Sequence, residues 1–242
     1  MKISGSTSTL LLAVTLMVGC SNGESSTPSV ESRCTSMEYD GYTYDLVQIG
    51  DQCWFAENLR SEHYANGDPI PGELSDGDWS STTSGAMTVY GEGTSIATVS
   101  NLFDYGRLYN WYAVDDARGL CPSDWHVPTD GEFMTLEMEL GMSESEANGS
   151  GWRGTDQGTQ MKSSASDSPS WNGTNSSGFS GLAGGYRNSN GAFLSEGDIG
   201  YFWSASAYGA NAWFRFLDGG DTEVFRFYNY QRYGFSVRCV RD

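Results

Sequence analysis

Five cysteines, an odd number, constrain the fold of this chain more than any other feature. Cys20 stands apart from the rest because it directly follows a short apolar run at residues 10–18. The other four are Cys34, Cys53, Cys121 and Cys239. In an exported protein such cysteines form disulfide bonds, which stabilise a chain made of short elements and long loops. Four cysteines allow three pairings.

The segment around Cys20 resembles a bacterial lipoprotein signal. Residues 17–20 are Met-Val-Gly-Cys, and Lys2 is the only charged side chain before them. The apolar run is much shorter than the about 20 residues that a membrane-spanning helix needs. We therefore expect residues 1–19 to be a lipoprotein signal peptide and Cys20 to be lipidated, which anchors the protein in a bacterial envelope membrane, most simply the outer membrane, facing the periplasm or the cell surface. A plain signal peptide with a free Cys20 is the alternative.

The next residues, 20–32, are Ser, Asn, Thr, Gly, Glu and Pro with only Val30 as an apolar side chain after the cysteine. Such a composition predicts a flexible tether. Residues 33–242 then form one domain, which is long enough to bury a core. Its 31 glycines and 14% aromatic residues favour many short strands joined by turns. The sequence thus predicts an α+β fold, with small twisted antiparallel sheets, one or two short helices and long polar loops.

The net charge of −18 excludes one large class of partners. Nucleic-acid binders need a basic surface to displace counterions, so nucleic acid is not a partner of this chain. The same charge opposes docking on anionic lipid headgroups, and membrane association must come from the lipid anchor. The many carboxylates make a structural calcium ion an alternative explanation of the acidic charge, but the sequence contains no calcium-binding motif. We expect no metal site and no cofactor.

The pattern of apolar residues predicts several elements. Residues 42–49 suggest a two-stranded hairpin with Cys53 and Trp54 just beyond it, and residues 66–100 suggest a polar surface excursion with a short strand at 87–90. The aromatic stretch 105–114 is typical of buried core. From residue 200 onward, strand-like runs at 201–207, 212–217, 222–228 and 234–240 predict an antiparallel meander.

One helix is clearly predicted. Pro128 bars a helix before it, Thr129 can cap the first turn, and Glu132 can reach back to complete a capping box. Phe133, Leu136 and Leu140 then follow at positions i, i+3 and i+7, which places them on one face, and Gly141 ends the run. The pattern indicates a short amphipathic helix packed by a single apolar stripe.

These stretches, in this order, resemble the Fibrobacter succinogenes major paralogous domain, a family of exported bacterial proteins without an established activity. The matching stretches are residues 47–60, 105–114, 120–129, 178–187 and 234–242. The resemblance implies a relative of the C-type-lectin-like fold, with the helix after Thr129 against the last strand. The chain lacks the calcium and sugar motifs of calcium-dependent lectins and the active-site cysteine arrangement of formylglycine-generating enzymes.

Of the three disulfide pairings we favour Cys34 with Cys53 across the first hairpin, and Cys121 with Cys239 between the turn before the helix and the last strand. A catalytic or metal-binding role for these cysteines is the alternative, but no CxxC spacing or adjacent histidine favours it.

Aromatic and polar residues of the loops are the best ligand-binding candidates. An indole ring can cover the C–H face of a sugar while amides and carboxylates bind its hydroxyls. The candidates are Trp79, Trp152, Trp171, Asp156, Asn172 and Asn175. The alternative is that each tryptophan folds back and fixes its own loop.

No GxSxG, P-loop or dinucleotide motif occurs, and pairs of acids such as Asp115 and Asp116 arise by chance in a chain with 31 acids. His126, between Trp125 and Val127, is better explained as a structural histidine than as a general base. The sequence therefore favours a non-catalytic envelope lipoprotein that binds or adheres to a ligand such as polysaccharide. A structural envelope protein acting through protein partners is the main alternative, and an extracellular hydrolase is a weaker one.

Overall fold

Four strands form the first sheet, in the order β1-β2-β3-β12. Their bounds are β1 Ser36–Tyr39, β2 Tyr42–Ile49, β3 Gln52–Phe55 and β12 Val240–Arg241. The predicted two-stranded hairpin is therefore wrong in extent, because Cys53 and Trp54 lie inside a third strand. All four residues of β3 are buried, since β2 and β12 flank this strand on both sides.

The computed structural model describes residues 1–2, 5 and 34–241. The predicted lipidation of Cys20, the tether at 20–32 and nearly all of the expected signal peptide lie outside these residues.

Six strands form the second and larger sheet, in the order β6-β11-β10-β9-β7-β8. They are β6 Gly151–Arg153, β7 Gly184–Arg187, β8 Phe193–Glu196, β9 Ile199–Tyr208, β10 Asn211–Asp218 and β11 Val224–Tyr230. Strands β9, β10 and β11 pair as a meander, as predicted, with Phe214 opposite both Trp203 and Phe227. A third, two-stranded sheet joins β4 (Met87–Val89) to β5 (Arg107–Tyr109).

The predicted fourth strand of the meander is wrong. Residues 234–240 do not pair with β11; Gly234, Phe235 and Ser236 make only isolated bridges to other strands, and Val240 pairs with Trp54 of β3. This segment therefore leaves the large sheet and crosses to the small one. Two-sided burial of residues 234–240 follows from this path between the sheets.

The described residues form six short helices, where the sequence predicts one or two. They are α1 Asp76–Ser81, α2 Ser100–Tyr105, α3 Trp111–Val114, α4 Asp130–Glu139, α5 Glu144–Ala147 and α6 Gln157–Met161. All except α4 have at most six residues, too few for a helical apolar period to be recognised. Three of these short helices begin at side-chain caps, namely Ser75, Asn110 and Ser143.

Helix α4 confirms its prediction. The Thr129 hydroxyl accepts a hydrogen bond from the Glu132 backbone N–H, and the Glu132 carboxylate accepts one from the Thr129 N–H. Phe133 and Leu136 are completely buried, and Leu140 packs at the edge of the same cluster.

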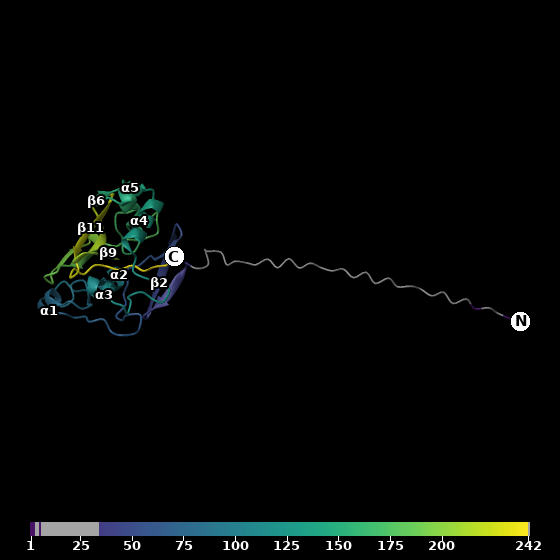
Figure 1. Cartoon of the computed structure of the whole chain (residues 1–242), viewed down its shortest axis with the longest axis horizontal. Helices are drawn as coiled ribbons and strands as arrows, with labels where there is room; N and C mark the ends of the chain where they lie inside the picture. The colour runs from purple at the N-terminus through teal and green to yellow at the C-terminus, as the bar shows by residue number, and fades with distance from the viewer. Residues whose placement is uncertain (3–4, 6–33, 242) are drawn as a thin grey trace.

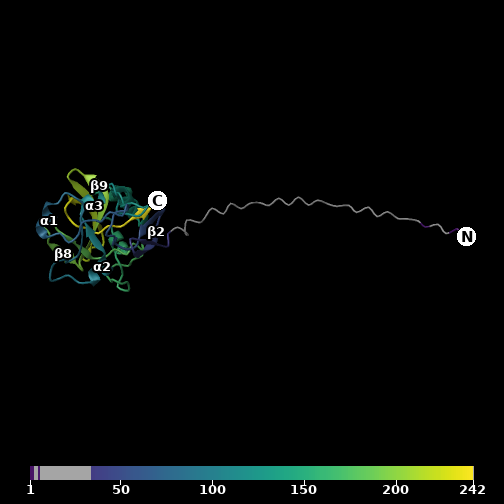
Figure 2. The same cartoon turned by 90° about the horizontal axis from the view of Figure 1, so that it is seen from below.

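Two apolar clusters lie on opposite faces of the large sheet. Phe202, Leu217 and Val224 pack with the apolar stripe of α4, while Trp203 and Phe214 pack with residues of the small sheets and α3. Strand β2 lies at one end of the domain and α1 at the other in both views, and the C-terminus lies beside β2 (Figure 1, Figure 2). The protein is thus an α+β domain, as predicted.

Candidate functional site

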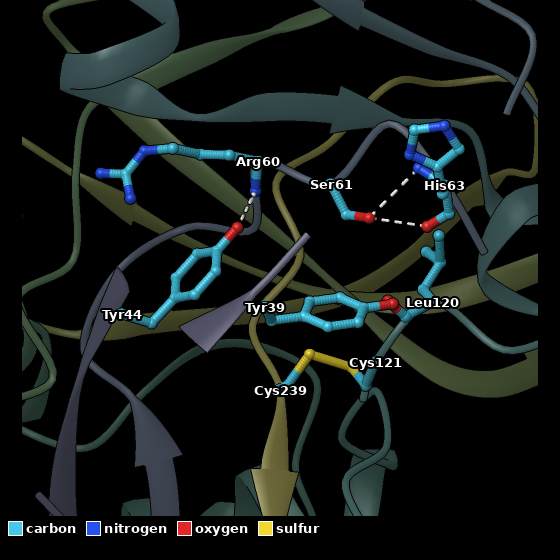
Figure 3. Close-up of a disulfide and its surroundings, with 8 residues drawn as sticks. All are labelled: Tyr39, Tyr44, Arg60, Ser61, His63, Leu120, Cys121 and Cys239. Carbon is cyan, nitrogen blue, oxygen red and sulfur yellow. Dashed lines mark hydrogen bonds between the residues drawn. A yellow bond between two sulfur atoms is a disulfide. The ribbon is translucent and has the colours of Figure 1, made fainter. Parts of the chain in front are cut away.

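Both favoured disulfides are confirmed. Cys34 is bonded to Cys53 and Cys121 to Cys239, with Cα atoms 5.7 and 5.9 Å apart. Figure 3 shows the second bond with Tyr39 above it, whose hydroxyl donates to the Leu120 carbonyl at 3.1 Å. Because both bonds are made, with three of the cysteines buried in the core and Cys34 packed against it, these four cysteines are structural.

A buried network of two carboxylates and three guanidinium groups joins α4 to the large sheet. Glu137 accepts from Arg153 at 2.7 Å and from Arg215 at 2.6 Å, and Asp130 accepts from Arg215 at 2.7 Å and from Arg226 at 2.6 Å. The side chains of Glu137 and Arg215 are completely inaccessible. Every charge has an opposite partner, so the network is part of the scaffold rather than a reactive site.

This network predicts acid-sensitive stability. Burial alone would raise the pKa of Asp130, but the hydrogen bonds and charges of Arg226 and Arg215 outweigh it and hold that pKa below the ordinary 3.8. The stabilisation is therefore present above the unfolded pKa and lost as the pH falls through the lower folded value. Urea unfolding between about pH 6 and about pH 3 should show a steep loss of stability, and Asp130→Asn should flatten it. Equal slopes for both proteins would contradict this assignment.

Trp79 cannot act as an accessible sugar platform, which corrects one of the sequence-predicted ligand residues. Its side chain is completely buried in α1, where the Arg187 guanidinium lies 4.5 Å from the ring centroid. The ring also lies so close to Gly234 that a Cβ atom there would be only 2.9 Å away. Trp79 therefore fixes its loop to the C-terminal segment, which is the alternative that the sequence left open.

Three more candidates hold loops together. Trp171 is partly buried, and the Lys162 Nζ lies 5.4 Å from the centroid of its ring. The Asn172 amide donates a hydrogen bond to the Gly219 carbonyl in the turn after β10. Asn175, at φ 53°, donates to Asp167 at 3.0 Å and accepts from the Ser180 backbone N–H at 2.9 Å. These groups are already engaged within the protein, which favours a structural role.

Asp156 lies at the start of α6 and accepts a hydrogen bond from the Gln160 amide at 3.1 Å. Trp152, on the edge strand β6, is 37% exposed. The structure therefore does not bring the six sequence candidates together into one site. Of the six, only Trp152 is part of a larger group of aromatic side chains on the large sheet.

Trp152 begins a row of aromatic rings that crosses five strands of the large sheet. Its ring contacts Phe225 of β11 at 5.1 Å, which stacks on Phe216 of β10 at 4.4 Å. Phe216 contacts Tyr201 of β9 at 5.3 Å, and Tyr201 contacts Tyr186 of β7 at 4.7 Å. Each of these four further rings is only partly buried: it packs against the core cluster that contains Trp203 and Phe214 and keeps part of its surface accessible.

The row widens at two places. Phe227, two residues after Phe225 on the same side of β11, is 38% exposed. Tyr233 stacks on Tyr186 at 5.8 Å, and the exposed Tyr230 lies 6.5 Å from Tyr233. We call this set, with the five rings of the row, the aromatic face.

Polar groups border the aromatic face. Strand alternation places Asp218 on the same side of β10 as Phe216, and Asn229 on the same side of β11 as Phe227. Burial raises the pKa of the Tyr201 hydroxyl, with Tyr186 and Asp218 adding to the effect, so this hydroxyl remains a hydrogen-bond donor at neutral pH. Flat apolar rings beside a carboxylate, an amide and a hydroxyl suit a ligand with both C–H faces and hydroxyl groups.

Comparison with known proteins identifies the family. A family model, the Fibrobacter succinogenes major domain, matches residues 47–241. The chain belongs to this family. No curated protein and no solved structure matches the chain significantly.

In this Fibrobacter succinogenes major domain, the stretches that carry the resemblance build the scaffold. Residues 47–60 form the end of β2 and all of β3, residues 105–114 form β5 and α3, and residues 234–241 form the crossing between the sheets. Of the aromatic face, only Tyr186 lies in one of those stretches. Alternation of Phe and Tyr along residues 199–230 was the signal that points to this face, but alone it cannot separate core from surface.

The family domain shows neither a long apolar helix nor a grouped set of metal ligands in its described part. No helix there has the length and apolar character needed to cross a bilayer. No three His, Cys, Asp or Glu side chains among those residues are grouped closely enough to hold an ion. His126 lies 2.5 Å from the Glu132 carboxylate, which already takes part in the cap of α4.

Proposed function

We propose that the protein is a non-catalytic binding or adhesion module of the bacterial cell envelope, and that its aromatic face holds polysaccharide. The observation that carries this proposal is the continuous, partly exposed row from Trp152 to Tyr186. Five strands at their usual spacing span roughly 20 Å, which is longer than one sugar unit and suits an extended chain. Lipidation at Cys20 would hold the domain at the membrane, with residues 20–32 as its tether.

The proposal includes a C-type-lectin-like relationship for the fold. Support comes from α4, which begins after Pro128 and packs its apolar stripe with Val240 of the last strand. The large acidic charge also supports a neutral ligand over an anionic one, because a surface of −18 repels acidic polymers.

The test is affinity electrophoresis of the protein on gels containing neutral plant and bacterial polysaccharides. Trp152→Ala and Phe227→Ala should each weaken the retarding interaction about tenfold, since an aromatic contact contributes about 1 kcal/mol beyond its buried area. Tyr208→Ala is the matched control, because this 47% exposed ring packs on Trp213 and Tyr228 and contacts none of the five rings of the row.

Two outcomes would count against the proposal. Either no polysaccharide retards the protein, or Tyr208→Ala weakens retardation as much as Trp152→Ala. Crosslinking from the aromatic face to a stoichiometric envelope protein would favour the alternative of a structural protein that acts through protein partners.

A further inference from the structure

A pocket of about 270 Å³ lies away from the aromatic face, where three distant segments meet. Its walls come from β2 and the residues after β3, from α2, and from the loop between residues 163 and 182. None of its lining residues belongs to the aromatic face. A volume just below the usual range for small-molecule sites fits one small ligand or one unit of a larger one.

Two buried polar groups of the wall have no partner among the residues that the structure describes. The Ser163 hydroxyl, in a residue only 1% exposed, makes no hydrogen bond. The Nε of Arg60 is also unpaired, although its Nη2 donates to Glu57 at 2.7 Å and to the Phe103 carbonyl at 3.1 Å. Figure 3 shows the Arg60 side chain extending away from the disulfide region. Buried polar groups in native proteins normally have partners, and two unpaired ones in the wall of one pocket make it a candidate ligand site.

Four carboxylates line the same pocket, and they divide into two kinds. The Glu57 carboxylate accepts hydrogen bonds from Arg60 and from the Asp45 backbone N–H at 3.0 Å. The Asp167 carboxylate accepts one from the Ser164 backbone N–H at 2.6 Å. The carboxylates of Asp45 and Asp104 accept no hydrogen bond within the described part of the chain. The pocket thus offers free acceptors at two aspartates, and its wall contains the Arg60 guanidinium group and the Ser163 hydroxyl.

These groups select among ligand chemistries. Anionic ligands are disfavoured because four carboxylates face one guanidinium group. An ammonium ion can donate to the aspartates but has no acceptor for Arg60. Neutral hydroxyl groups can donate hydrogen bonds to the aspartates and also accept them from Arg60. Phe103, which is 64% exposed in α2, adds a flat apolar ring at the edge of the pocket.

We propose that this pocket binds one neutral hexose unit, such as the end or a branch of a glycan. Its hydroxyls donate to Asp45 and Asp104 and accept from Arg60, and its C–H face lies against Phe103. This site goes beyond the proposed function, because it recognises a single sugar unit independently of the aromatic face.

Saturation-transfer NMR on the full chain with free glucose, galactose and mannose tests the proposal. At least one neutral hexose should give a signal, and glucuronic acid should give none. Asp104→Asn and Phe103→Ala should each weaken hexose binding about tenfold. The matched control is Asp51→Asn, which changes an exposed aspartate in the turn after β2 that does not line the pocket.

Ser163→Ala separates binding from folding. Removing an unpaired buried hydroxyl should leave the Tm of the ligand-free protein unchanged or higher, while hexose binding falls several-fold. Absence of binding by every neutral hexose, equal binding of glucuronic acid, or unaltered binding by Asp104→Asn would overturn the proposal. If the protein binds a hexose but no polysaccharide retards it, the proposal for the aromatic face is refuted and the pocket stands. If polysaccharide retards the protein but no hexose binds, the proposal for the pocket is refuted and the aromatic face stands.

Discussion

Glu137→Gln should lower the free energy of unfolding by about 3–5 kcal/mol, because it removes one partner from a buried ion network. The glutamine keeps the volume of the side chain but supplies a single acceptor oxygen to Arg153 and Arg215, which both donate to Glu137 now. Its amide N–H groups would also face guanidinium donors. Urea unfolding with both disulfides intact gives the measurement.

Glu139→Gln is the control for this change. Glu139 lies on the same helix two residues later and is exposed, so its substitution should alter stability by no more than about 0.5 kcal/mol. If Glu137→Gln does not fold, the same ion network can be tested by measuring the stability of Glu137→Met, of Arg153→Met and of the double variant. The double variant should be less destabilised than the sum of its single changes, because it removes opposite charges together. Additive effects would show that the two charges are not coupled.

The network also shows where sequence patterns fail. Helix α4 was predictable because Pro128, Thr129 and Glu132 determine its start through local contacts, and the apolar stripe extends over about two turns. Asp130 and Glu137 are on the same helix, yet a charged residue in a helix pattern normally indicates an exposed position. Their burial depends on Arg215 and Arg226, which lie opposite each other in register on β10 and β11. No local pattern joins α4 to those strands.

Arg238 illustrates the same limit in the last segment. Alternation with Val237 and Cys239 predicts that its side chain points outward, as in a strand with one exposed face. It is instead completely buried, donating to Asn58 at 2.7 Å and to the carbonyl of Phe179 at 2.6 Å. The reason is topological: residues 234–240 run between two sheets, so both sides of the segment are covered.

The candidate site was only partly predictable for a related reason. Trp152 and Trp79 both occur in polar surroundings in the sequence, but one is a ring on an edge strand and the other is completely buried. Whether a large aromatic side chain is exposed depends on what the rest of the chain places over it. Disulfides were more predictable, because bonding needs only that two cysteines lie on neighbouring elements, and turns and strand ends indicate those positions.

Removing the Cys121–Cys239 bond is the second change with a large expected effect. Cys121→Ala with Cys239→Ala should cost about 4 kcal/mol, since the chain-entropy cost of a crosslink grows with the closed loop and reaches about 4.7 kcal/mol for 100 residues. This bond closes 118 residues of sequence separation, against 19 for Cys34–Cys53. On the same account, a loop of about 15 residues corresponds to about 3 kcal/mol, so the matched double variant at Cys34 and Cys53 should lose less.

Local structure strengthens this expectation. Strand β12 has only two residues, and the segment before it makes single bridges rather than a continuous ladder. Backbone hydrogen bonds to several separate segments, including Arg187, Tyr109 and His126, hold the crossing in place without forming one ladder. The bond from Cys239 to the turn at Cys121 adds a covalent link. Without that bond, Arg238 and Phe235 would be held between the sheets by hydrogen bonds and packing alone. Thermal unfolding of both double variants tests this expectation. An equal or greater loss of Tm in the Cys34–Cys53 variant would contradict it. That result would mean that the C-terminal segment is held by its packing rather than by its disulfide.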